Sequence, residues 1–144
     1  MAIFPSKEWC EQAVRLVNED PEAAQAGAGW EGDFGAVILP EPGKLAKAFT
    51  AYVVPSKEGR LEKLKILPDP DDLEEIEPAY LARAPYSVWK GLLLGTVDPV
   101  EAVLKRRIDV KGDLQPLMER LKYRGIADRV LAKLETTFVD AEGQ

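Results

Sequence analysis

The sequence predicts an α/β domain of the α+β type, in which helices cover one face of a single five-stranded sheet. Five short segments between Trp30 and Lys111 show the apolar alternation with a period of two that is typical of strands. The first three of these follow one another through short turns, which indicates antiparallel pairing. Three helix starts surround the last strand, between Ser87 and Leu121.

Two helices are predicted in the N-terminal part. Residues Ser6–Asn18 form an amphipathic pattern with Trp9 on the apolar side. Asp20 and Pro21 then begin a second, short helix, because aspartate caps helix N-termini and proline suits the first turn. The glycines within 27–29 end it.

Alternation predicts strands over Trp30–Leu39, Leu45–Val54, Arg60–Leu67 and Ala79–Ala84, the first three forming an antiparallel meander. Between the third and the fourth lies the acidic segment Asp69–Glu77. It lacks the glycine and the regularly spaced oxygen ligands of a calcium loop, so we interpret it as a solvated loop and not as a metal site.

The stretch Ser87–Leu121 predicts three helices around a fifth strand over Arg107–Lys111. Ser87 is a weak cap for the first helix, whereas Asp98 and Asp113 are strong caps for the second and third. The apolar positions of this stretch are Trp89, Leu92, Leu93, Val100, Val103, Leu104, Ile108, Val110, Leu114, Leu117, Met118 and Leu121.

The helical pattern resumes after Gly125, a residue that kinks or splits the closing helix. From Asp140 onward we expect frayed residues.

Length and composition indicate one globular domain over residues 1–144. No apolar run reaches the length of a bilayer span and no secretory segment is recognisable, so we expect a cytoplasmic protein.

The single cysteine, Cys10, falls in the first helix, where we expect a small buried hydrophobic side chain. Histidine is absent, which removes imidazole catalysis and the usual zinc sites. The composition fits a protein from a thermophile, because the thermally labile residues Asn, Cys and Met are scarce while Pro, Glu and Arg are plentiful.

The net charge of −6 is unevenly distributed, because Lys105–Lys133 holds nine Lys or Arg residues and only four Asp or Glu residues. One interpretation is contact with an anionic membrane surface or an acidic partner. The other is a solvated helix face, since opposite charges are interspersed there. The overall acidity and the absence of a known binding motif argue against nucleic acid.

Three phrases in the second half, YSVWK at Tyr86–Lys90, GTVDP at Gly95–Pro99 and IDVKGDL at Ile108–Leu114, resemble the sterol carrier protein type-2-like family. The helix around Trp9 and the phrase that begins at Trp30 fit its prokaryotic stand-alone members, so the resemblance extends over nearly the whole chain.

The resemblance implies a five-stranded, mostly antiparallel sheet with helices on one side and an apolar tunnel between the layers. It also implies that this tunnel holds a fatty acid, lipid or sterol-like molecule, with no covalent chemistry. We expect no cofactor and no metal. The ligand-binding residues that follow are Trp89, Leu92, Leu93, Val103, Leu104, Ile108, Val110, Leu114, Leu117, Met118 and Leu121. The same side chains would also make an ordinary close-packed core, and both interpretations stay open.

An enzyme would need a nucleophile or a tuned acid beside a base. Cys10, Tyr86, Ser87 and Lys90 are candidates by residue type, but no spacing joins them, so we expect no catalysis. The alternative to a carrier is an interaction module, which would form a homodimer or serve as an accessory domain to an enzyme without a lipid ligand.

Overall fold

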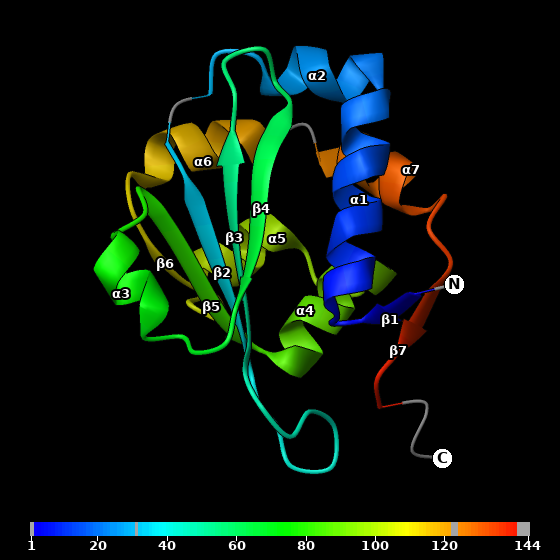
Figure 1. Cartoon of the computed structure of the whole chain (residues 1–144), viewed down its shortest axis with the longest axis vertical. Coiled ribbons are helices and arrows are strands. Elements are labelled where there is room, and N and C mark those ends of the chain that lie inside the picture. Colours follow the sequence, from blue (N-terminus) through cyan, green and yellow to red (C-terminus); the bar gives the residue numbers. More distant parts are fainter. Residues whose placement is uncertain (1, 31, 122–123, 141–144) are drawn as a thin grey trace.

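The computed structural model describes residues 2–30, 32–121 and 124–140, and it confirms the α+β architecture (Figure 1). The sheet is formed by β2 (Phe34–Leu39), β3 (Phe49–Pro55), β4 (Leu61–Leu67), β5 (Tyr80–Pro85) and β6 (Asp109–Lys111), in the order β4-β3-β2-β5-β6. The central strand β2 pairs in parallel with β5, while the other neighbouring pairs of the sheet are antiparallel. The predicted single five-stranded, mostly antiparallel sheet is therefore confirmed.

Helices cover one face of this sheet, which we call the inner face. Figure 1 shows α5 (Pro99–Leu104) and α6 (Leu114–Arg120) behind the strands and α1 (Lys7–Glu19) and α7 (Arg124–Leu131) beside them. Ile38, Ala82 and Ala84 point to this face and pack against helical and loop residues in two core clusters. The helices are α1 (Lys7–Glu19), α2 (Pro21–Gly27), α4 (Tyr86–Leu94), α5 (Pro99–Leu104), α6 (Leu114–Arg120) and α7 (Arg124–Leu131).

The acidic segment is a correction to the sequence interpretation, because part of it is helix α3 (Asp72–Ile76) rather than loop. Leu73 of this helix is only 1% exposed and packs with Val37 and Leu81 on the outer face of the sheet. A Cβ on Gly35 would lie 2.9 Å from the Leu73 side chain, so the glycine makes room for it. Ile76 packs against the same cluster, and the many carboxylates around these two apolar residues concealed the helix in the sequence.

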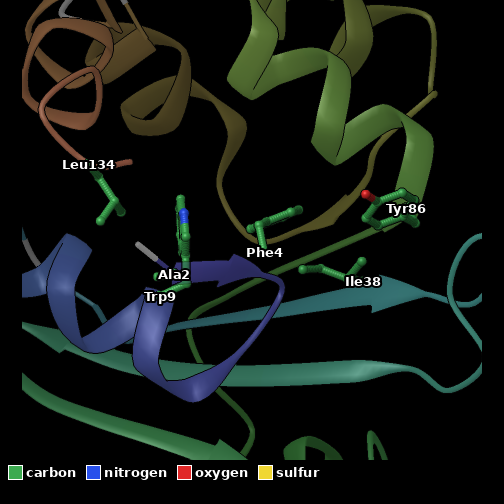
Figure 2. Packing of buried hydrophobic residues seen from close by; sticks show 6 residues of the cluster. All are labelled: Ala2, Phe4, Trp9, Ile38, Tyr86 and Leu134. Carbon is green, nitrogen blue, oxygen red and sulfur yellow. The ribbon is translucent and has the colours of Figure 1, made fainter. Parts of the chain in front are cut away.

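A second, two-stranded sheet was not predicted. β1 (Ala2–Phe4) and β7 (Thr136–Phe138) pair in parallel, and three residues are too few to reveal a period of two. Figure 2 shows Phe4 between Trp9 and Tyr86, near Ile38 of β2. The Trp9 indole N–H also donates to the Thr136 hydroxyl at 2.9 Å, which joins the two ends of the described chain.

The predicted helix caps are mostly confirmed. Asp98 and Asp113 accept bonds from backbone N–H groups in the first turns of α5 and α6. The prediction for Ser87 is wrong: Pro85 is the N-cap of α4, because β5 runs directly into this helix. The backbone N–H and the hydroxyl of Ser87 instead donate to the Glu41 carboxylate at 2.7 and 2.5 Å.

The chain beyond Leu121 differs from prediction in detail. The closing helix is divided in two, as one of the two predicted effects of Gly125, but the division precedes this residue: α6 ends at Arg120, α7 begins at Arg124, and residues 122 and 123 lie outside the described residues. Asp140, which we expected to be frayed, accepts bonds from Tyr86 at 2.7 Å and from Lys90 at 2.9 and 3.0 Å. Residues 141–144 lie outside the described residues. Within the described ranges, no helix combines the length and the apolarity of a bilayer span.

Candidate functional site

A cavity of about 750 Å³ lies between the inner face of the sheet and the helices α1, α4 and α7. The sheet contributes two pairs of facing residues, Ala36 with Ala51 and Ile38 with Phe49. The helices contribute Trp9, Cys10, Trp89, Leu92, Leu93 and Leu131. Its polar lining comes from the segment around α5 and from α7, through Thr96, Asp98, Glu101 and Asp128.

The cavity exists because the middle of the inner face carries small side chains. Ala51, Ala36 and Ala82 lie in register across three adjacent strands. Ala36 is partly exposed although it sits on the central strand, whereas the next residue, Val37, is fully buried on the outer face. Protein interiors are normally packed to the density of organic crystals. At this point of the sheet the hollow therefore lies on the helix-facing side.

A second cavity, of about 490 Å³, continues along the same pair of strands. It is lined by Phe34 and Val53, which face each other one step along the inner face from Ala36 and Ala51. Ala127 of α7 lines both cavities. The remaining walls come mainly from α1, α2, α6 and α7, through residues such as Val17, Ala23, Leu117 and Val130. The two cavities thus follow one another under β2 and β3.

A third cavity, of about 440 Å³, adjoins the larger one and shares Trp9, Leu93 and Leu131 with it. Phe138 of β7 forms part of its wall. The small parallel sheet that was missed in the sequence therefore borders the hollow region.

Five of the eleven predicted ligand-binding residues line these cavities. Trp89, Leu92, Leu93 and Leu121 line the larger cavity, and Leu117 lines the 490 Å³ cavity. The Trp89 ring is held in place because its N–H donates to the carbonyls of Val37 and Ala84, both at 3.1 Å.

The other six lie elsewhere. Ile108 is buried in the core beside β5, with Val110 packed against it. Val103 and Met118 are partly buried, and Leu104 and Leu114 are exposed, at 70% and 44%. None of these six lines the cavities described here. Ile108 and Val110 belong to a packed part of the core, and the other four lie on α5 and α6, which are short and turn only part of each stripe inward: α5 buries Ala102 alone. A ligand contact by any of the eleven stays a prediction.

Sequence reasoning missed the strand side of the cavities, namely Phe34, Ala36, Ile38, Phe49 and Ala51. The signal was present, since the period of two already placed these residues on one face of their strands. The sequence pattern does not give the register between β2 and β3, which places Ala36 opposite Ala51.

Of the reactive residue types identified in the sequence, Tyr86 and Lys90 meet at Asp140, whereas Ser87 bonds to Glu41. Cys10 lines the larger cavity, and burial, followed by the nearby charge of Glu11, raises the pKa of its thiol to about 11. Burial and the hydrogen bond to Asp140 raise the pKa of Tyr86. Burial opposes ionisation of Asp140, but the bonds from Lys90 and Tyr86 lower its pKa overall. These three polar residues therefore satisfy one another, in keeping with a structural network between α4 and the segment after β7.

The fold and the cavities together define an α+β protein with a hollow core, and solved structures share this fold. A crystal structure of sterol carrier protein 2 aligns with a TM-score of 0.71 at 20% identity, over 87% of this chain and 94% of that chain. A conserved hypothetical protein from Thermus thermophilus, described as possibly a sterol carrier protein, aligns with a TM-score of 0.67 at 20% identity, over 87% of each chain. The sterol carrier protein domain 2 of Helicoverpa armigera aligns with a TM-score of 0.55 at 14% identity, over 91% of each.

The chain therefore has the sterol carrier protein 2 fold, as the resemblance in its sequence implied. No protein-family model and no curated protein matches it. Identities of 20% and below establish the fold alone.

Proposed function

We propose that this protein binds an apolar ligand, such as a fatty acid, lipid or sterol-like molecule, in its internal cavities and carries it without catalysis. One observation carries the proposal: a cavity of about 750 Å³ lies against Ala36 and Ala51 in the middle of the inner face, where a packed core would be expected. Ligand sites in proteins typically measure about 300–1,000 Å³ and are mostly apolar.

The energetics favour an apolar occupant. Side chains around an empty space lose dispersion contacts on that side, and a hydrocarbon chain restores them. Each methylene group that leaves water contributes about 0.8 kcal/mol. The affinity for a homologous series should therefore rise about fourfold per methylene and level off when the cavities are full.

The absence of catalysis is part of the proposal. Among the described lining residues of the larger cavity, Cys10 carries the strongest nucleophile by type. Its raised pKa keeps the thiol protonated near neutral pH, and the protonated thiol is a poor nucleophile. The name of the similar structure, sterol carrier protein 2, supports a carrier over an enzyme.

Mass spectrometry of the organic extract of gently purified protein tests the proposal. We expect a co-purifying apolar molecule, and we expect saturable binding of a fluorescent fatty acid after delipidation. A protein that carries no lipid, takes up no probe and forms a clean dimer in native mass spectrometry would instead support the interaction module.

Two neighbouring variants link any uptake to the cavities. Leu117 lines the 490 Å³ cavity, whereas Met118 beside it lines none of the cavities described above. Leu117→Phe should fill empty space, so we expect weaker uptake with little loss of stability. Met118→Phe should leave uptake unchanged, and an equal loss in both variants would contradict binding at this site.

A further inference from the structure

The two cavities under β2 and β3 differ in charge. Arg120, the last residue of α6, is the one charged side chain among the described residues that line the 490 Å³ cavity. The larger cavity is lined by Asp98, Glu101 and Asp128, and no described lysine or arginine lines it. Glu101 is paired with Lys105 at the surface. Among the described residues, a molecule lying along the strands would therefore meet a cationic lining residue only at the end of the 490 Å³ cavity.

The guanidinium of Arg120 is fixed in position. It donates to the carbonyl of Ala26 at 2.6 Å and to that of Ala28 at 3.2 Å, at the C-terminal end of α2. Its carbon also lies 5.8 Å from the centre of the Trp30 ring, which itself lines the cavity. These two bonds use two of the five N–H groups of the guanidinium, which leaves three for a ligand. The planar guanidinium is suited to binding carboxylates.

The walls beside Arg120 suit a hydrocarbon chain. Phe34 and Val53 line the same cavity and lead along the strands to Ala36 and Ala51 in the larger one. A head group at Arg120 would thus be followed by continuous apolar surface. Burying a carboxylate in such surroundings is costly unless it is paired and hydrogen-bonded, and Arg120 supplies both.

We propose that Arg120 determines the head-group specificity and the orientation of the ligand: it binds the carboxylate of an anionic single-chain amphiphile, whose hydrocarbon chain runs beneath Phe34 and Val53 toward the larger cavity. The opposite orientation would place the carboxylate near Asp128, away from Arg120. This inference rests on the proposed function and narrows its ligand class to anionic amphiphiles.

Three probes of equal chain length test it: dodecanoate, dodecanol and dodecylammonium, measured by calorimetry at pH 8 on the delipidated protein. We expect dodecanoate to bind at least tenfold more tightly than dodecanol, since a hydrogen bond to a charged group contributes that much or more. Dodecylammonium should bind most weakly of the three. Equal binding of all three, or tightest binding of dodecylammonium, would overturn the role of Arg120 while leaving the proposed function intact. Failure of all three to bind would overturn both.

Variants separate specificity from a merely structural role. Arg120→Gln should remove the preference for dodecanoate and leave the affinity for dodecanol within about twofold, while Arg120→Lys should retain part of the preference. Arg107→Gln makes the same change in net charge at an exposed residue that lines neither cavity, and it should leave the preference unchanged. Equal weakening of dodecanoate and dodecanol in Arg120→Gln would mean that Arg120 only holds α2 in place, and would overturn the proposal.

Discussion

Ala36 of β2 lies directly opposite Ala51 of β3, and both methyl groups face the 750 Å³ cavity. The same row continues to Ala82 of β5, but there the space is filled, because Ala82 is only 4% exposed and packs with Val97 and Ile108. One register row thus contains both a hollow and a packed position.

This contrast predicts opposite results for one substitution at two sites. Ala51→Leu should be neutral or stabilising, because the larger side chain fills empty space, and it should weaken uptake of a fluorescent fatty acid. Ala82→Leu should overpack the core and destabilise by ~1–3 kcal/mol. Urea unfolding of both variants measures the difference. Comparable destabilisation in the two would mean that the larger cavity is closed in solution.

Cys10 offers a chemical reporter of the same cavity, since it is the only cysteine of the chain. The thiolate is the reactive form, and burial raises the pKa of this thiol to about 11. Its alkylation rate should therefore keep rising about tenfold per pH unit up to roughly pH 10. Saturating fatty acid should protect the thiol, and mass spectrometry follows the adduct. Rapid labelling at pH 7, unaffected by ligand, would contradict this placement.

The ion pair between Asp20 and Arg129 predicts how stability depends on acid. Both guanidinium terminal nitrogens donate to the carboxylate, at 2.8 and 3.0 Å, and the pair joins α7 to the start of α2. The hydrogen bonds from Arg129, followed by the bond from the backbone N–H of Ala23, lower the pKa of Asp20 to about 2. The ionised form therefore stabilises the fold fully above its usual pKa of 3.8, and this contribution is lost as the pH falls toward 2.

Asp20→Asn tests this, because asparagine still caps the helix but carries no charge. We expect the wild type to be more stable than the variant by a constant margin above about pH 5, with the margin closing between about pH 4 and pH 2. Chemical unfolding across that range measures it. A margin independent of pH would show that the charge of Asp20 contributes nothing.

Gly59 in the turn between β3 and β4 has a φ of +82° and packs on α2, where an added Cβ would lie 2.0 Å from the Ala24 carbonyl oxygen. Gly43 has a similar φ of +77° but no neighbour within 4 Å. Gly43→Ala should therefore lower the free energy of unfolding only by the ~1–2 kcal/mol that a left-handed backbone costs a residue with a side chain. Gly59→Ala should lower it clearly more, because its side chain would also clash with α2. Thermal melting of the two variants compares them, and equal losses would contradict the close approach of this turn to α2.

The sequence by itself determined the local features of this protein. A period of two placed Phe34, Ala36 and Ile38 on one face of a strand, and short polar side chains before helices identified Asp98 and Asp113 as caps. These signals depend on residues within one element, so they can be read without knowing any partner.

The tertiary structure decided the rest, because it depends on contacts between distant residues. The pairing of β1 with β7 joins the two ends of the described chain through three residues on each side. Leu73 can pack on the sheet because Gly35, far away in the sequence, has no side chain at that point. The helix stripes looked equivalent in the sequence, yet Trp89 and Leu92 face the cavity while Leu104 faces solvent. Apolar periodicity fixes which side of a helix is apolar, but the cavity arises from the register that aligns Ala36 with Ala51, and register is set between strands.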